Sequence, residues 1–301
     1  MIYVVNKYFE KHPMCMIVIG VIGISLSSIF VRYSSAPSTV TAAFRLIWTV
    51  LLMSPVILGS KVTRRELLEV DRKSLAMSSI SGVFLAVHFV VWFESLQYTS
   101  VASSTTIVCT EVIWVALGFC LFMKGKLSWK AAMAIVVTFA GSILIAYADS
   151  AVGETHFWGD VLAWIAAVAV AVYTLLGRIV RSKVSTGIYT YIVYVSCAVV
   201  LVLMCLIQGQ HLFSYGWRAV FVGLLLALFS TIMGHSIFSW CLKYFSPAFV
   251  SASKLCEPLV AAVFASMLFD EQPSWLQVLG GILILGGVFY YSILVKHKND
   301  E

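Results

Sequence analysis

Ten long runs of apolar residues alternate with short polar connections along the chain. The runs cover residues 14–31, 39–58, 74–96, 100–122 and 128–147 in the first half, and 157–176, 186–208, 216–240, 246–269 and 273–295 in the second. Each run has roughly the 20 residues that an α-helix needs to cross the hydrocarbon layer of a bilayer. The pattern predicts an all-α polytopic membrane protein with ten transmembrane helices and no soluble domain.

The composition agrees with this pattern. Of the 301 residues, 61% are hydrophobic and only 11% are charged, whereas a soluble domain is about 45–50% apolar and about 25% charged. The net charge of +6 does not indicate a nucleic-acid partner, because the cations lie in short connections between apolar runs. All seven cysteines fall in apolar runs without a CxxC spacing, so we interpret them as packing residues and expect no metal and no cofactor.

The lysines and arginines are unevenly shared between the two sets of alternating connections. One set, with the termini, holds Lys7, Lys11, Lys61, Arg64, Arg65, Arg72, Lys73, Lys124, Lys126, Lys130, Arg178, Arg181, Lys183, Lys243, Lys296 and Lys298. The other set holds only Arg32 and Arg218. The positive-inside rule therefore predicts that both termini are cytoplasmic. A plasma membrane, such as the inner membrane of a bacterium, suits this compact chain with short loops.

The two halves of the chain are related by a weak internal repeat. Glu111 and Glu257 are separated by 257 − 111 = 146 positions, and the same offset aligns Ser128-Trp129 with Ser274-Trp275. We therefore divide the chain into repeats at 1–150 and 151–301. Five spans in each half make the second repeat inverted in the membrane, an arrangement typical of secondary transporters with a midplane site between the repeats.

Several motifs resemble a known family. They are Pro37-Ser-Thr-Val-Thr-Ala-Ala-Phe-Arg45, Ser95-Leu-Gln-Tyr-Thr-Ser-Val-Ala102, Glu257-Pro258, Asp270-Glu271 and the glycine-rich last span. Together they resemble the drug/metabolite transporter superfamily, specifically its ten-helix EamA-type carriers. The resemblance implies two five-helix bundles around a central cavity, and export or exchange of small metabolites. Val112 departs from the pattern, because its repeat mate is Pro258, and we expect span four to be straighter than span nine.

Ionisable residues within the spans are the candidates for substrate binding, because such residues are costly in a bilayer and usually functional. Glu111 and Glu257 each lie half-way along a span, and Lys254 shares a helical face with Glu257. Lys254 has two readings: an internal ion pair, or a clamp in which it binds a substrate carboxylate while a glutamate binds the amine. These three groups would carry a net charge of −1, which favours a cationic substrate or a proton as the balancing charge.

Aromatic and imidazole side chains complete the candidate site. His88 and Trp92 lie four residues apart in span three, His235 lies in span eight and Tyr173 in span six. We expect them to act as hydrogen-bonding groups, aromatic walls or proton relays. Arg45, two turns into span two, is expected to be structural and to extend toward the outer interface.

These observations predict a secondary transporter, not an enzyme, that moves a small polar or zwitterionic metabolite such as an amino acid, an amine or S-adenosylmethionine. Its expected partners are that small molecule, the lipid bilayer and protons as candidate coupling ions, and we expect a monomer or a weak homodimer. A sugar or nucleotide-sugar exchanger would need several basic residues in the cavity. An intramembrane enzyme using Glu111 or Glu257 as acid or base would turn over in detergent without a second compartment.

Overall fold

A computed structural model describes residues 13–98, 101–123, 127–150, 157–269 and 274–299, and all regular structure in these ranges is helical. In the first half, α2 (Pro13–Arg32), α3 (Ser38–Gly59), α5 (Arg72–Tyr98) and α8 (Trp129–Ser150) correspond to spans one, two, three and five. Span four consists of α6 (Val101–Val108) and α7 (Glu111–Phe122). The helix limits agree with the predicted runs to within a few residues.

The second half has the same order. The helices α9 (Phe157–Val180), α10 (Thr186–Ile207) and α15 (Trp275–Asn299) are continuous, and η1 (Leu212–Tyr215) is a short 3₁₀ turn before span eight. Span eight consists of α11 (Gly216–Leu225), the π-helix η2 (Leu226–Ser236) and α12 (Ile237–Cys241). Span nine consists of α13 (Pro247–Ser253), the 3₁₀ turn η3 (Lys254–Cys256) and α14 (Glu257–Phe269).

Within the described ranges, six helices are individually long and apolar enough to cross a membrane, and α7 and the cores of α8 and α15 are shorter apolar helices. Large apolar side chains such as Leu51, Leu203 and Phe289 are exposed on the flanks of the molecule. A chain with this surface is an all-α polytopic membrane protein, in which lipid covers the exposed apolar side chains.

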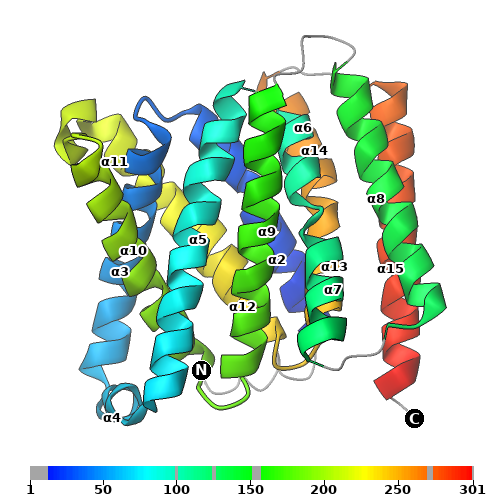
Figure 1. Ribbon diagram of the computed structural model, residues 1–301. Coiled ribbons are helices and arrows are strands. Elements are labelled where there is room, and N and C mark those ends of the chain that lie inside the picture. Colours follow the sequence, from blue (N-terminus) through cyan, green and yellow to red (C-terminus); the bar gives the residue numbers. More distant parts are fainter. Residues whose placement is uncertain (1–12, 99–100, 124–126, 151–156, 270–273, 300–301) are drawn as a thin grey trace.

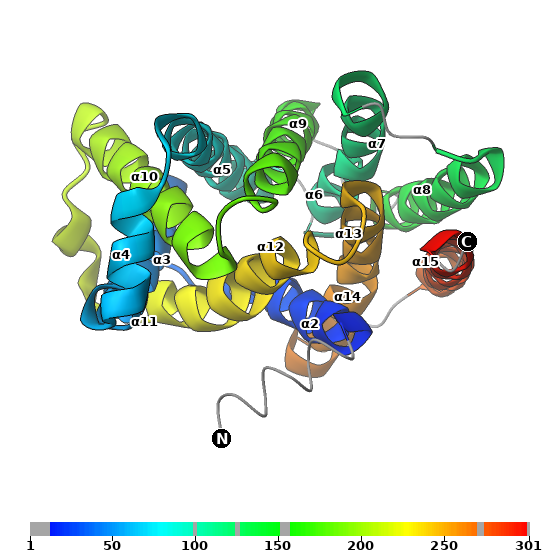
Figure 2. The same ribbon diagram turned by 90° about the horizontal axis from the view of Figure 1, so that it is seen from below.

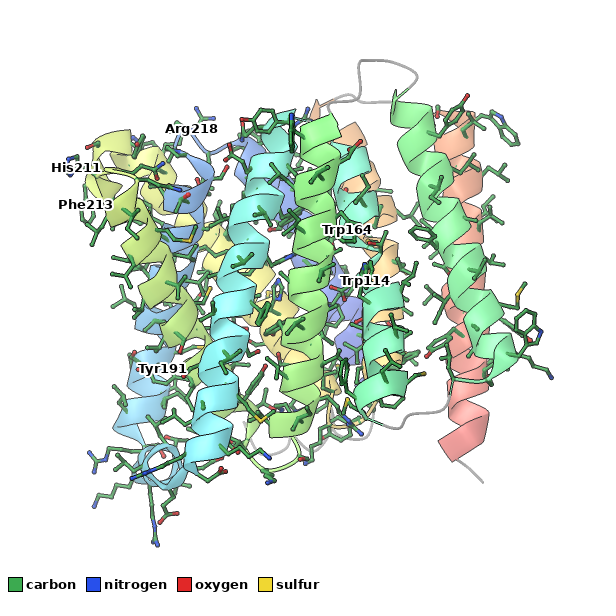
Figure 3. The ribbon with its side chains drawn as sticks, viewed as in Figure 1. Trp114, Trp164, Tyr191, His211, Phe213 and Arg218 are labelled. Atoms are coloured by element: carbon green, nitrogen blue, oxygen red, sulfur yellow. The ribbon has the colours of Figure 1, made fainter. Side chains whose placement is uncertain are left out.

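The two halves run in opposite directions. The helix α2 runs away from the edge of the molecule that carries the short helix α4 (Lys61–Glu69), here called the α4 edge, whereas α9 runs toward it (Figure 1). The opposite edge carries His211, Phe213 and Arg218 (Figure 3). The repeat is therefore inverted, as the span count predicts.

The buried apolar side chains form two cores, and each core contains helices from both halves. The first core joins α3 and α5 to α9, α10 and α11. The second joins α2, α7 and α8 to α12, α13 and α15. Seen from the α4 edge, α10 and α11 lie at one end of the molecule and α8 with α15 at the other, while α2, α9 and α13 lie between them (Figure 2). Each of the two packed groups of helices thus combines helices from both sequence repeats.

Glycines allow the closest helix contacts in both cores. A Cβ atom on Gly82 of α5 would lie 2.5 Å from the Val193 carbonyl oxygen of α10, and one on Gly141 of α8 would lie 2.7 Å from the Gly280 carbonyl oxygen of α15. Small residues at such contacts let helix backbones approach closely inside a membrane. The glycine pair of α8 and α15 joins two spans that the repeat offset relates.

The basic segment between spans two and three differs from the prediction. The predicted apolar runs leave residues 59–73 as a polar connection, but Lys61–Glu69 forms α4. Asp71 then accepts a hydrogen bond of 3.0 Å from the Ser74 backbone N–H at the start of α5. Hydrogen bonding by the Ser74 side chain and by its backbone N–H lowers the pKa of the exposed Asp71 carboxyl. The prediction missed α4 because no continuous apolar run marks it.

Candidate functional site

Both candidate glutamates begin the second part of a broken helix. Glu111 is the first residue of α7 and Glu257 is the first residue of α14. The positive end of a helix dipole stabilises a carboxylate at such a position. The offset of 146 therefore relates two glutamates that also share a local structure.

Pro258, which lacks a backbone N–H, explains the break in span nine. Ser246 caps α13 by accepting a hydrogen bond of 3.2 Å from the Phe249 N–H, and Pro247 follows it at the first turn. At the other end, Pro258 has no N–H to donate to the Lys254 carbonyl, the usual acceptor four residues back. The Glu257 N–H donates to that carbonyl instead, which gives the 3₁₀ turn η3.

Span four breaks at the matching level, so the expectation that it would be straighter is wrong. Between α6 and α7, the Thr110 N–H donates to the Ile107 carbonyl at 3.0 Å and the Val112 N–H donates to the Cys109 carbonyl at 3.3 Å. These bonds span three residues rather than four, so the turn tightens as it does in η3. A proline is therefore not required for a break in the helix. Cys109 and Glu111, which flank this break, contact Lys254 of span nine.

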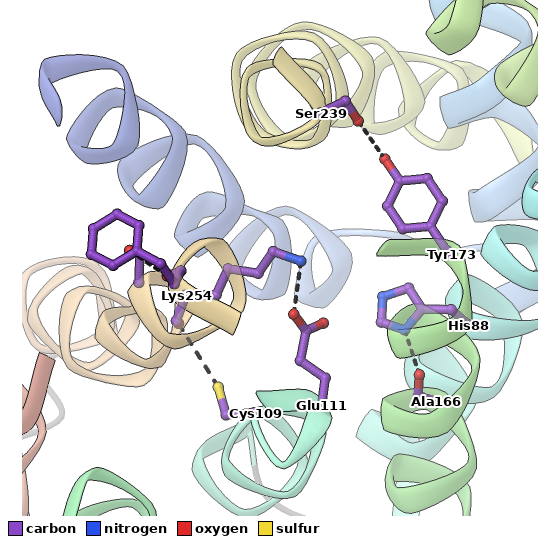
Figure 4. A network of polar contacts seen from close by, with 9 residues as sticks. His88, Cys109, Glu111, Ala166, Tyr173, Ser239 and Lys254 are labelled. Carbon is purple, nitrogen blue, oxygen red and sulfur yellow. Dashed lines mark hydrogen bonds and ion pairs between the residues drawn. The ribbon is translucent and has the colours of Figure 1, made fainter. Parts of the chain in front are cut away.

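The two breaks meet across the repeat interface. The Lys254 Nζ donates to Glu111 Oε1 at 2.9 Å, and both side chains are buried (Figure 4). The Cys109 thiol lies 3.9 Å from the Lys254 carbonyl oxygen, and the Lys254 Nζ lies 5.5 Å from the centroid of the Phe238 ring. Sequence reasoning placed Lys254 beside Glu257 on one helix, but its salt-bridge partner is the glutamate of the other repeat.

Arg45 is a further charged residue of the site. Its Nε donates to Thr231 Oγ1 of η2 at 2.7 Å, its Nη1 donates to Ser27 Oγ of α2 at 3.1 Å, and its Cζ lies 4.0 Å from the centroid of the Phe89 ring. Arg45 is only 1% exposed. The expectation that it extends to the outer interface is therefore wrong, because these three groups hold the guanidinium inside the bundle.

These residues surround one internal cavity of ≈ 30 Å³. Its lining includes Arg45, His88, Trp92, Glu111, His235, Lys254 and Glu257. Apolar lining residues come from both cores, with Trp92 and Val170 in the first and Ile24 in the second. Such a volume admits one or two water molecules, so the cavity must enlarge before a metabolite can enter.

His88 and Trp92 form one wall. The His88 Nδ1–H donates to the Ala166 carbonyl at 3.0 Å, which leaves Nε2 as an acceptor on the side of Glu111 and Lys254 (Figure 4). The His88 and Trp92 rings stack with centroids 5.9 Å apart, and the centroids of the His235 and His88 rings lie 6.3 Å apart. The buried Trp92 indole N–H has no hydrogen-bond partner in the described part of the chain, so this wall retains an unused donor.

Tyr173 is the one predicted site residue that does not line the cavity. Its hydroxyl is hydrogen-bonded to Ser239 Oγ at 2.8 Å (Figure 4). Tyr173 follows Ala166 by about two turns in α9, which runs toward the α4 edge (Figure 1). Arg181 also donates to the Ser239 carbonyl, at 3.2 Å, and Arg178 donates to the Leu242 carbonyl. These contacts join α9 to the end of span eight, so Tyr173 holds two helices together outside the cavity lining.

The formal charges around the cavity balance. Glu111 and Glu257 carry two negative charges, and Lys254 and Arg45 carry two positive charges, so the sum is zero instead of the −1 predicted without Arg45. Among the described residues, no cluster of three or more His, Cys, Asp or Glu side chains is suited to a metal ion. The arrangement is suited to a guest that carries both signs of charge.

The sequence contained the signal for Arg45, since it is an ionisable residue within a span, but not the direction of its side chain. That direction depends on Ser27 and Thr231, which are 18 and 186 positions away. The π-helical turn that holds Thr231 had no detectable sequence signal. π-Helical turns are rare and are often found at functional sites.

Comparison with known proteins gives a consistent result. The EamA-like transporter family matches the chain twice, over residues 12–147 and 157–293. An "Uncharacterized transporter" of Archaeoglobus fulgidus is 24% identical over 254 residues, covering 82% of this chain and 86% of that protein. The "Uncharacterized transporter YxxF" of Bacillus subtilis is 23% identical over 289 residues, covering 92% and 87%.

The fold is also found among solved structures. One, described as "Crystal structure of protein", matches with a TM-score of 0.77 at 14% sequence identity. The match covers 95% of this chain and 98% of the other. At this identity the likeness concerns the fold alone.

The buried ion pair generates a stability prediction. Glu111→Gln and Lys254→Met should each lower the free energy of unfolding by about 3–5 kcal/mol, because each leaves one buried charge without its partner. The double variant Glu111→Gln/Lys254→Met should lose less than either single variant, since it leaves no unpaired charge. Thermal unfolding of the purified protein in detergent measures this order.

The exposed pair Arg65–Glu69 is the matched control. Its side chains are 80% and 61% exposed at an N–O distance of 2.6 Å, so removing either charge should cost no more than about 1 kcal/mol. Strictly additive losses at Glu111 and Lys254 would contradict a direct interaction between them.

Proposed function

The chain belongs to the EamA-like transporter family, and from this membership we propose that it carries a small polar or zwitterionic metabolite by alternating access. The candidate guests are an amino acid, an amine or a molecule of the S-adenosylmethionine type. One observation carries the proposal: two carboxylates and two cations surround one buried cavity where two symmetry-related helices break. Charges in a bilayer interior are rarely retained without a function.

The location of the site suits this mechanism. The cavity lies where the two cores meet, and the repeats that build it are inverted. In secondary transporters of this kind, one bundle rocks against the other around a fixed midplane site. Arg178, Arg181 and Tyr173 would hold the α4 edge closed in the present conformation and release it in the other.

An anionic cargo such as a nucleotide sugar is the alternative that Arg45 favours, because it adds a second cation to the cavity. The zero sum of the formal charges favours the zwitterion instead. A proton exchanged at a glutamate or a histidine would supply coupling, since carboxylates and imidazoles are the groups that proton-coupled carriers use.

We also propose that the protein lies in a plasma membrane with the α4 edge toward the cytoplasm. The support is the cluster of Lys61, Arg64 and Arg65 in α4 at that edge, against Arg218 at the other (Figure 3). In intact cells, a membrane-impermeant maleimide should label Arg218→Cys and leave Glu69→Cys unlabelled. The reverse labelling would contradict the orientation.

Flux through proteoliposomes tests the transport proposal. Vesicles would take up a pool of radiolabelled amino acids with S-adenosylmethionine, with and without a pH gradient. Glu257→Gln should lower the initial rate at least about tenfold, equivalent to ~1.4 kcal/mol, because the amine of the substrate loses its anionic partner. Glu111→Gln should also lower it, since Lys254 is then unpaired, and Glu69→Gln is the matched control at the surface.

A pH-gradient effect that disappears in one glutamate variant would assign the proton to that residue. Wild-type rates in both variants, with protein of normal Tm, would contradict the site. No uptake of any zwitterion, together with uptake of a labelled nucleotide sugar, would establish the alternative cargo. Turnover of a lipid-linked substrate in detergent would favour an enzyme.

A further inference from the structure

The four cavity charges are not equivalent. Lys254 and Glu111 satisfy each other at 2.9 Å, whereas no ion pair involving Arg45 or Glu257 is found among the residues that the structure describes. A substrate carboxylate that recruited Lys254 would have to break a buried ion pair and leave Glu111 uncompensated, which is strongly unfavourable. The two charges without an ionic partner therefore have the greater need of a charged ligand.

The Arg45 guanidinium has the geometry and the donors to bind a carboxylate. A guanidinium has five N–H donors in a planar fork that matches a carboxylate, and only two of them are used, on Thr231 and Ser27. The Phe89 ring below the guanidinium and the two hydrogen bonds come from three different elements, α5, η2 and α2. The group is thus held in place before a ligand arrives, which reduces the entropy that binding costs.

Glu257 provides the opposite charge on the same cavity. Its backbone is fixed by the break in span nine, and Ser25 Oγ of α2 lies 3.4 Å from its carbonyl oxygen. Its carboxylate has no hydrogen-bond partner among the described residues, and the side chain is only partly buried. A carboxylate in this state has unfilled acceptor positions that an ammonium group fills with charge-assisted hydrogen bonds.

Resting on the proposed function, we propose that Arg45 binds the carboxylate and Glu257 binds the ammonium group of a zwitterionic substrate. The Glu111–Lys254 pair then acts as a positioning element that locks the two helix breaks together. Arg45 lies on α3, next to the first core, and Glu257 lies on α14, whose partner α2 belongs mainly to the second core. A bound zwitterion would bridge the two cores, so binding is coupled to closure.

Competition among substrate analogues tests this assignment. Proteoliposomes would take up the radiolabelled amino acid pool against three unlabelled competitors: the amino acids, the corresponding amines without the carboxylate, and the corresponding acids without the amine. For the wild type, amines and acids should each compete at least about tenfold less well than the amino acids, because each leaves one buried charge of the site unpaired.

The variants should change this preference selectively. In Arg45→Gln the amines should compete as well as the amino acids, and in Glu257→Gln the des-amino acids should do so. The neutral double variant Glu111→Gln/Lys254→Met should keep the wild-type preference, though at a lower rate. Arg218→Gln and Glu69→Gln, at exposed positions, are the controls for the cation and the carboxylate.

Arg45→Lys keeps the positive charge and guards against a folding defect in Arg45→Gln, and it should give a preference between those of the wild type and the glutamine variant. Loss of the preference in the double variant, with retention in Arg45→Gln and Glu257→Gln, would overturn the assignment in favour of Lys254 and Glu111. Absence of uptake of amino acids, amines and S-adenosylmethionine by the wild type would instead refute the proposed function itself. The two failures are therefore distinguishable.

Discussion

A charge inside a bilayer needs an opposite charge or strong polar contacts close to it, and this constraint explains the centre of the molecule. Lys254 is neutralised by Glu111 from the other repeat, while Arg45 is supported by two hydroxyls and an aromatic ring. These contacts join α2, α3, α5, η2, α7 and η3 at one level. The packing of the helices around this level is therefore tied to the polar network and not only to apolar contacts.

The helix breaks are what make this network possible. A continuous helix would keep its N–H groups in its own hydrogen-bond ladder, whereas α7 and α14 begin inside the protein and present their positive dipole ends to Glu111 and Glu257. Pro258 explains one break, because it cannot donate a hydrogen bond. The other occurs beside Val112, where the contacts of Cys109 and Glu111 with Lys254 accompany the tightened turn. The inverted repeat thus yields two similar breaks from different local sequences.

The sequence predicted the spans well because the length and apolarity of a transmembrane helix follow directly from the bilayer. The offset of 146 also predicted that Glu111 and Glu257 would be equivalent. It did not predict the partner of Lys254, since the ion pair depends on how close the two breaks approach each other. The position of Arg45 and the place of Tyr173 behind the cavity depend on side-chain directions set by η2 and α12, which have no periodic signal. The short helix α4 was missed because its residues are mostly polar.

The two cores meet at a charged cavity of ≈ 30 Å³, and the boundary between them is where we propose that they separate. The small volume leaves no room for a metabolite in the described conformation, and the contacts of Tyr173, Arg178 and Arg181 join α9 to the end of span eight. A neutral sum of four charges allows a zwitterion to enter without leaving an excess charge in the membrane. The proposal of alternating access around this cavity rests on the charge arrangement together with this boundary between the two cores.

The central claim is that this cavity is where the transported molecule binds, and protection of one cavity residue tests it most directly. Val108 lines the cavity at the end of α6. In a variant without the seven native cysteines, a cysteine at position 108 would be alkylated by a small water-soluble thiol reagent, and one at exposed position 218 would serve as control. The account predicts that a saturating amino acid pool slows alkylation at 108 several-fold and leaves the rate at 218 unchanged. Equal rates at 108 with and without the pool, in protein that transports it, would contradict the account.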